Sequence, residues 1–178
     1  MSRACDYPDM HSQADKGLFR GLVDDHRGLV ARIASAYEAR EDLAEELVQD
    51  VFLAVWRALD RFRGDAGLRT YVARIAHNVC ASHVRKAVRR KTVPLEDQHL
   101  EPVPSAEADA GELDNRLRLV AAIRSLPLPD RQLVTLHLEG FSNREIAETL
   151  DLSEGNAAVR LTRVRAKLKS KLEVGNES

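Results

Sequence analysis

Basic side chains recur at helical spacing near the end of the chain. They are Arg160, Arg163, Lys167 and Lys171, with Arg165 and Lys169 beside them. No acidic residue lies between Gly155 and Lys171. Cations at this spacing neutralise the phosphates of nucleic acid, and a helix that presents them fits the major groove of a duplex. The alternative is a basic surface helix that is simply solvated.

A helix-turn-helix motif is predicted around these cations. Ser142 stands three residues before Glu145, which is the spacing of a capping box at a helix start. The helix 143–150 is followed by a short turn, and Ser153 can cap a last helix that runs to about Leu172. Its inward stripe comprises Leu161, Val164, Leu168 and Leu172. Capping box, turn and charge stripe together favour duplex DNA binding.

The start of the last helix supplies the residues that would approach base edges. Asn156 has a short polar side chain, while Ala157 and Ala158 are small enough to let the backbone come close to the groove. Arg160 and Arg163 can contact either bases or phosphates, and residue types alone do not separate these two roles.

A second cationic helix is predicted from Leu68 to Lys91, again with no acidic residue. Its cations are Arg69, Arg74, Arg85, Lys86, Arg89, Arg90 and Lys91. Tyr71 and Asn78 follow the RGDAG loop at its start. Single-stranded DNA binding requires a cationic track with places to stack or pocket a base. These residues permit that interpretation, and a solvated basic helix is the alternative.

Neither a metal site nor an enzyme active site is predicted. His77, Cys80 and His83 are spaced by three, but on one helix the third lies about 120° around from the first, so they do not converge on one ion. Cys80 has no second cysteine nearby and is expected to be a buried thiol rather than a redox switch. The sequence contains no phosphate-binding glycine loop, nucleophile elbow or metalloprotease motif, and we expect no cofactor.

Two further helices must position the second cationic helix. The helix from Glu41 to Phe62 has two apolar rows, formed by Leu43, Leu47, Val51, Val55 and Leu59 and by Val48, Phe52 and Trp56. Its polar residues fall mostly outside these rows and are expected to be exposed. The helix from Lys16 to Ala39 contains Gly21 and Gly28, which allow a break near Asp25 to Gly28.

The composition favours an all-α chain of two small helical domains. Hydrophobic residues make up 44% of the 178 residues, and the net charge is -1. We expect a flexible leader at 1–15, a helical domain of three or four helices at 16–91, an acidic flexible linker at 92–112 and a helix-turn-helix domain at 113–173. The linker combines prolines with unbalanced acids. It is either a solvated tether or a nucleic-acid mimic that occupies a basic channel of a partner.

A cytoplasmic location is expected from three absences in the sequence. The two cysteines, Cys5 and Cys80, form no disulfide framework. No apolar run approaches membrane-spanning length, and the N-terminal residues lack the apolar core of a signal peptide.

Two blocks of the chain resemble bacterial RNA polymerase sigma factors. The block DLAEELVQDVFLAVWRALDRFRGDAGLRTYVARIAHN resembles their second conserved region, and SLPLPDRQLVTLHLEGFSNREIAETLDLSEGNAAVRLTRVRAKLKSKL resembles their fourth. Two such blocks around a divergent linker are similar to the small extracytoplasmic-function (ECF) class. The resemblance covers roughly Leu18 to Leu172 and implies a subunit that directs core RNA polymerase to promoters and opens them.

The resemblance also implies roles for individual residues. Residues that would bind the β′ clamp helices of the polymerase are Glu46, Gln49, Asp50, Leu53 and Arg57. Residues that would bind the opened minus-ten element are Arg63, Gly64, Asp65, Leu68, Arg69, Tyr71, Arg74, Asn78, Arg85 and Lys86. Residues that would bind the minus-thirty-five duplex are Ser153, Glu154, Asn156, Ala157, Arg160, Arg163, Arg165 and Lys167.

The RGDAG loop would form a pocket for a flipped base, with Asn78 as a base-contacting amide. The linker would thread toward the active centre and the RNA exit path. The implied partners are core RNA polymerase, through its β′ and β subunits, promoter DNA, and an anti-sigma factor that releases the protein under stress.

The sequence departs from the family pattern at the recognition helix. Many members have a Lys or Arg followed by a Ser where this chain has Ala158 and Val159, and Asn156 replaces a frequent Thr. The family's minus-thirty-five contacts therefore do not transfer directly.

Two other functions are compatible with parts of the sequence. A stand-alone helix-turn-helix regulator of duplex operators would explain 142–172 but leave 43–91 unused. An all-α adaptor that binds no DNA would show no steep salt dependence of DNA binding.

Overall fold

The computed structural model describes residues 13–64, 67–90 and 110–174. Within these ranges it contains α-helices, one 3-10 turn and connecting loops, which confirms the all-α prediction. The chain order is α1 (Gln13–Ser35), α2 (Glu41–Ala58), the 3-10 turn η1 (Leu59–Arg61), α3 (Leu68–Arg90), α4 (Ala110–Arg124), α5 (Leu128–Leu138), α6 (Asn143–Leu150) and α7 (Glu154–Val174). Most of the acidic linker expected at 92–112 falls outside the described residues, and α4 begins at its C-terminal edge.

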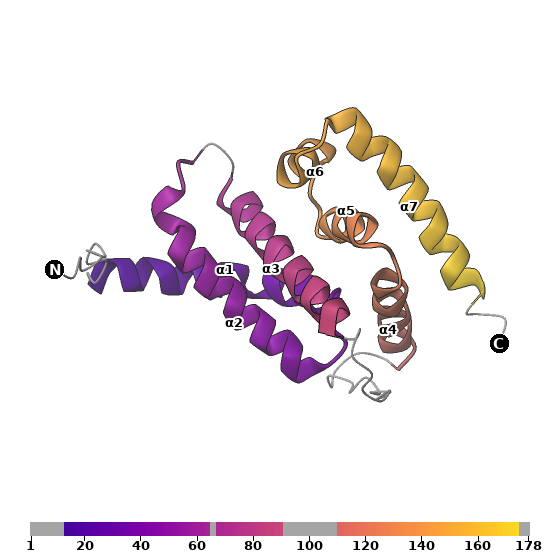
Figure 1. Ribbon diagram of the computed structural model, residues 1–178, viewed down its shortest axis with the longest axis horizontal. Coiled ribbons are helices and arrows are strands. Elements are labelled where there is room, and N and C mark those ends of the chain that lie inside the picture. The colour runs from indigo at the N-terminus through magenta and orange to yellow at the C-terminus, as the bar shows by residue number, and fades with distance from the viewer. Residues whose placement is uncertain (1–12, 65–66, 91–109, 175–178) are drawn as a thin grey trace.

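The first three helices pack against one another (Figure 1). Helix α2 buries Leu47, Val48, Val51, Phe52 and Val55, which belong to the two predicted apolar rows. The remaining members of these rows, Leu43, Trp56 and Leu59, are half-buried. Helix α1 runs without the break that its glycines allow, because Leu22, Leu29 and Ile33 bury one continuous face and this burial outweighs the weak helix propensity of glycine.

The junction between α2 and α3 is closed by an aromatic contact. The helix expected to reach Phe62 ends at Ala58 and tightens into η1. The Tyr71 hydroxyl donates a hydrogen bond of 2.7 Å to the Ala58 carbonyl, and the Tyr71 and Phe62 rings lie 4.9 Å apart. Gly64 follows with φ +78, a left-handed conformation that glycine adopts without a steric penalty.

The last four helices form the predicted helix-turn-helix unit. Pro129 lies in the first turn of α5, where a missing N–H costs nothing. Ser142 and Glu145 form the complete capping box of α6. Hydrogen bonds from the Ser142 hydroxyl and amide lower the pKa of Glu145. At the start of α7, the Ser153 hydroxyl accepts a hydrogen bond of 3.3 Å from the Asn156 amide.

The two groups of helices are docked together, with α5 and α6 beside α3 (Figure 1). The Arg32 guanidinium donates two hydrogen bonds, of 2.7 and 2.8 Å, to the Glu139 carboxylate after α5. The Arg69 guanidinium lies 4.1 Å from the Phe141 ring centre and also donates to the Glu139 carbonyl. Glu139 and Phe141 of the α5–α6 connection therefore hold α1 and α3.

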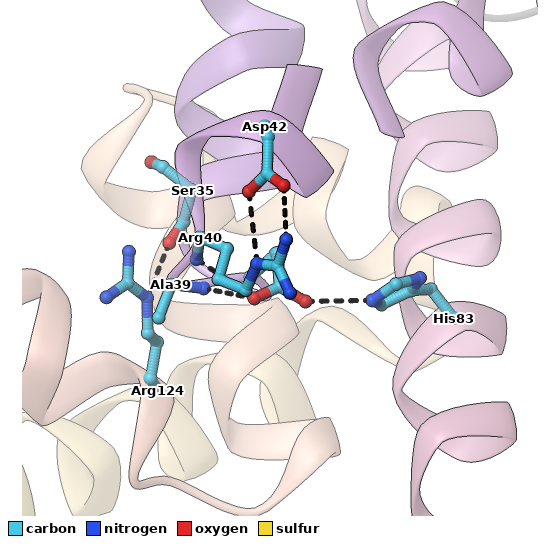
Figure 2. A network of polar contacts seen from close by, with 7 residues as sticks. Ser35, Ala39, Arg40, Asp42, His83 and Arg124 are labelled. Carbon is cyan, nitrogen blue, oxygen red and sulfur yellow. Dashed lines mark hydrogen bonds and ion pairs between the residues drawn. The ribbon is translucent and has the colours of Figure 1, made fainter. Parts of the chain in front are cut away.

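A carboxylate in the turn between α1 and α2 organises a second junction (Figure 2). Glu38 accepts hydrogen bonds from the Ala39 and Arg40 amides and from His83 Nε2 on α3. Burial raises the pKa of Glu38, but these hydrogen bonds together lower it below its ordinary value. On the same turn, Arg124 Nε of α4 donates 2.8 Å to the Ser35 carbonyl.

Tyr37, in the same turn, belongs to a buried polar cluster. The Tyr37 hydroxyl and His77 Nδ1 share a hydrogen bond of 2.8 Å, and the Arg131 guanidinium lies 5.5 Å from the Tyr37 ring centre. Arg131 also donates to the Leu126 and Arg124 carbonyls at the end of α4. Burial lowers the pKa of His77 to about 3, and His77 Nε2 has no hydrogen-bond partner among the described residues. His77 is therefore neutral at physiological pH.

The depressed pKa of His77 predicts a pH dependence of stability. The unfolded chain binds a proton near the ordinary histidine pKa of about 6.5, whereas the folded chain does not until far lower pH, so stability is lost as pH falls below about 6.5. Between pH 6.5 and 5 this amounts to about 2 kcal/mol. Denaturant unfolding across this range should show the loss in the natural protein, and the variant His77→Gln should remove most of it.

The matched control is His137→Gln. Burial also lowers the pKa of His137, which lies at the surface of α5, so its removal should flatten the pH dependence less. An unchanged slope in His77→Gln would contradict the assignment. The measurements stay above pH 5 because most carboxylates titrate below that pH and would otherwise add their own pH dependence.

Candidate nucleic-acid interface

The cations of α7 lie on its exposed side, opposite a buried stripe. Leu161, Val164 and Leu168 are buried, as predicted, and Arg163, Arg165 and Lys167 are exposed. Helix α7 contacts α4, α5 and α6 and lies at the edge of the molecule away from α1 and α2 (Figure 1). Its outer face is therefore accessible to a long rod such as duplex DNA.

One carboxylate positions two of these cations. The Asp130 carboxylate of α5 lies 2.8 Å from Lys167 Nζ and 3.7 Å from the Arg160 guanidinium. The Arg165 guanidinium donates to His137 Nε2. Burial and the nearby Arg165 charge both lower the pKa of His137, which keeps the ring neutral and able to accept. Neither Arg163 nor Arg165 has a carboxylate partner among the described residues, so the charges of these two are less compensated than those of Arg160 and Lys167.

Two predicted contacts at the start of α7 have different environments. Ala157 is only 1% exposed and belongs to the buried stripe, so its side chain faces the core. We therefore leave Ala157 out of the proposed interface. Ser153, Glu154 and Asn156 are exposed, and the Ser153 hydroxyl is engaged in the helix cap.

The second group of predicted contacts lines α3. Its exposed members are Arg69, Arg74, Asn78, Arg85 and Lys86. Arg74, Asn78 and Arg85 lie opposite the buried Val72, Ala73, Ala76 and Cys80, whereas Arg69 continues the buried row at the start of the helix. The Asn78 side chain has no hydrogen bond within the described residues, so its amide can meet a base edge. Arg63 and Gly64 are exposed and Leu68 is half-buried at the α2–α3 junction. Asp65 lies outside the described residues.

Several of the α3 residues already have protein partners: the Arg74 guanidinium lies 5.7 Å from the Tyr71 ring centre, and Arg85 donates a hydrogen bond of 3.4 Å to the Ser82 hydroxyl. The Tyr71 hydroxyl bonds to Ala58 and its ring packs on Phe62, so Tyr71 supports the junction loop. The Arg69 guanidinium is held by Phe141 and the Glu139 carbonyl. The sequence predicted both as DNA contacts and missed these partners, because Phe141 and Glu139 are far from them along the chain.

The residues assigned to a polymerase contact form one strip along α2. Glu46, Gln49, Asp50, Leu53 and Arg57 are all exposed, and they fall within about 100° of helix arc. Leu53 is 46% exposed, whereas the other large apolar residues of α2 are buried or half-buried. The strip thus combines both charges, an amide and one apolar side chain.

A groove between α1 and α2 adjoins this strip. It is an open surface hollow with a volume of about 560 Å³. Gln49 and Leu53 line it together with Phe19 and Trp56, whose rings meet edge to face at 4.7 Å. Sequence patterns did not mark Phe19 and Trp56 as site residues, since apolar residues at helical spacing indicate core packing first.

The described residues contain no group of three or more His, Cys, Asp or Glu side chains that could hold a metal ion. Cys80 is buried, and burial raises the pKa of its thiol to about 12. His83 is paired with Glu38. In the same ranges, no helix has the length and apolar character that crossing a bilayer requires.

Comparison with known protein families identifies the family to which this chain belongs. Residues 22–90 match the model of Sigma-70 region 2, and residues 116–168 match that of Sigma-70, region 4. The chain is a member of the sigma-70 family. The two matched regions contain the α2 strip, the α3 cations and the helix-turn-helix unit, so the surfaces described above are those of a sigma factor.

Curated relatives place the chain in the ECF class. It is 29% identical over 159 residues to the ECF RNA polymerase sigma factor SigM of Mycobacterium tuberculosis, which covers 89% of this chain and 79% of the relative. It is 29% identical over 184 residues to the ECF RNA polymerase sigma-E factor of Escherichia coli, which covers 90% of each chain. The chain is a sigma factor that directs RNA polymerase to promoters.

Solved structures share the fold. The sigma factor RpoE of Bartonella quintana, in complex with the anti-sigma factor NepR, superposes with a TM-score of 0.69 at 24% identity, over 88% of this chain and 97% of that one. CnrH in complex with the cytosolic domain of CnrY gives a TM-score of 0.66 at 27% identity, over 89% and 90%.

The contacts of Glu139 predict how firmly the two groups of helices are held together. Removing its carboxylate in Glu139→Ala deprives Arg32 of two hydrogen bonds between the groups, at an expected loss of about 1 kcal/mol, since Arg32 is half exposed and solvent screens the pair. The free energy of unfolding should fall by this amount, and small-angle scattering should show a larger radius of gyration.

The matched control is Glu148→Ala. Glu148 pairs with Arg144 within α6. An exposed ion pair at this helical spacing stabilises a helix by only about 0.2–0.5 kcal/mol. Equal scattering curves for the two variants would show that Glu139 does not hold the groups together.

Proposed function

We propose that this sigma factor divides its work among three surfaces: the α2 strip binds the β′ clamp helices, α3 binds the opened minus-ten strand, and α7 reads the minus-thirty-five duplex. The observation that supports this division best is the separation of exposed charge. The α2 strip contains both charges, whereas α3 and the outer face of α7 have cations and almost no acids.

The α2 strip suits a helical partner. Leu53 and the adjoining groove offer apolar contact area beside Gln49, Asp50 and Arg57, and interfaces commonly place such an anchor within a polar rim. A pair of helices in the β′ subunit is the partner that the family resemblance implies. Contact with the β subunit stays a prediction without assigned residues.

The α3 face suits single-stranded DNA. Arg74, Arg85 and Lys86 would follow the backbone, and the unengaged amide of Asn78 would contact a base. Tyr71 would act indirectly: its hydrogen bond to Ala58 and its ring contact with Phe62 would hold the chain that leads into the loop at 63–67, where the resemblance places the pocket. An unstacked base needs a preformed pocket to offset an unstacking cost of a few kcal/mol.

The α7 face suits the major groove. Its N-terminal part presents Glu154 and Asn156, and Arg160, Arg163, Arg165 and Lys167 follow. Asp130 holds Arg160 and Lys167 in place, which reduces the side-chain entropy lost when they meet phosphates. Arg163 is exposed and has no such anchor among the described residues.

The remaining assignments follow from the same proposal. The domain limits are 16–91 and 113–173, with a leader before them and an acidic linker at 92–112. The chain acts in the cytoplasm, where it meets the polymerase, and catalysis is left to that enzyme. Both structural neighbours are bound to a partner, named as an anti-sigma factor for RpoE, and we propose a partner of that class for this chain.

Reconstituted transcription tests the proposed function. Purified core enzyme with this protein should transcribe a genomic DNA pool from a restricted set of start sites, which mapping of RNA 5′ ends will show. Core enzyme alone is the control. If the protein binds duplex DNA but yields no specific starts and never co-purifies with core enzyme, the function as a sigma factor is refuted and a stand-alone regulator is favoured.

The α2 strip makes a specific prediction. Asp50→Ala should weaken association with core enzyme by about fivefold or more, the effect expected when a contributing interface residue is truncated. Glu45→Ala is the matched control, because Glu45 is an equally exposed acid on the same helix, about 100° from the centre of the strip. Affinity is measured by fluorescence titration, and unfolding curves establish that both variants fold. Equal affinities would remove Asp50 from the interface.

A further inference from the structure

An isolated apolar side chain lies on the outer face of α7. Val159 is 53% exposed, whereas Ala157, Leu161, Val164 and Leu168 of the same helix are buried. With about 100° of rotation per residue, Val159 points nearly opposite to the middle of that buried stripe. It therefore occupies the part of α7 that reaches farthest from the core.

The neighbours of Val159 on this face are polar. Asn156 precedes it by three residues, and Thr162 and Arg163 follow by three and four, so all share its side of the helix. The Thr162 hydroxyl donates to the Ala158 carbonyl at 3.1 Å and is thereby used within the helix. The side-chain amide of Asn156 and the guanidinium of Arg163 have no hydrogen-bond partner among the described residues, and they lie on either side of the Val159 side chain.

The chemistry of the major groove restricts what such a side chain can recognise. The base edges there present hydrogen-bond donors and acceptors, and thymine alone adds an apolar group, its 5-methyl. An isopropyl group makes no hydrogen bond, so against any other base edge it covers polar atoms without replacing their water. Its favourable partner is the thymine methyl.

We propose that Val159 is a specificity-determining residue that reads the 5-methyl group of a thymine in the upstream duplex element. This inference rests on the proposed function, since it requires α7 to lie in the major groove. Single exposed apolar residues are common on protein surfaces. What distinguishes Val159 is its position at the centre of the face, between an amide and a guanidinium that can fix the register of the helix on DNA.

Deoxyuridine provides a direct test, because it differs from thymidine only by the missing methyl group. The probe is a synthetic promoter duplex copied from the strongest start site found in reconstituted transcription, with each upstream thymine replaced singly. Binding is measured for the holoenzyme that full-length protein forms with core enzyme, at fixed salt. For the natural protein, one replacement should weaken binding about three- to fourfold, the effect of removing one methyl group from an apolar contact.

The variant Val159→Ala tests whether Val159 is the residue that detects the methyl group. It should bind the thymine and deoxyuridine duplexes equally, with the affinity that the natural protein shows for the deoxyuridine duplex. Arg163→Ala should weaken binding to both duplexes by the same factor. Val88→Ala, which truncates an exposed valine on α3, should keep the full discrimination of the natural protein.

Two kinds of failure are distinguishable. Three results would refute the role of Val159 and leave the proposed function standing. The holoenzyme could bind the promoter specifically with the same affinity after every replacement, or Val159→Ala could discriminate between the duplexes as the natural protein does. The third such result is an upstream element that contains no thymine. If no promoter-specific start or binding is found at all, the proposed function fails and the role of Val159 fails with it.

Discussion

Helix α3 must be buried along one face while its opposite face stays cationic, and the rest of the structure depends on that division. Its inward residues are small, with Ala73, Ala76 and Cys80 among them. Small side chains let neighbouring helices approach closely, and α1, α2, α5 and α6 all pack against α3. The cations that we propose to face DNA thus lie on a helix that packs against four others, so the protein itself holds that helix in place.

The docking of the two helical groups uses part of the same cationic surface. Arg69 contacts Phe141 and the Glu139 carbonyl, and the same guanidinium cannot make these contacts and bind a phosphate with the same atoms. Asn78 and Lys86 have no contact of this kind among the described residues, and the Arg74 guanidinium lies 5.7 Å from the Tyr71 ring centre. The arrangement therefore distinguishes cations that hold the protein together from cations that are available to DNA.

Ion pairing makes a similar distinction on α7. Asp130 lies beside Arg160 and Lys167 and neutralises part of their charge, while His137 accepts from Arg165. The outermost part of the helix is left to Asn156, Val159 and Arg163. A face with one amide, one apolar group and one uncompensated cation is suited to reading base edges, whereas the paired cations at its flank are suited to holding phosphates.

The sequence by itself determined the helices, their buried faces and their local caps. The apolar rows of α2, the capping box of Ser142 and the stripe of α7 depend on residues only a few positions apart, and such short-range chemistry is written directly in residue order. It also determined which faces are cationic.

Tertiary structure decided which of those residues are free to act. Ala157 proved to be core, Tyr71 proved to hold the loop, and Arg69 proved to contact the C-terminal helices. Each outcome depends on a partner distant in sequence, such as Phe141, or on the rotation of one helix against another. Helical periodicity identifies a face but not what covers it, so the packing of side chains in space had to supply the rest.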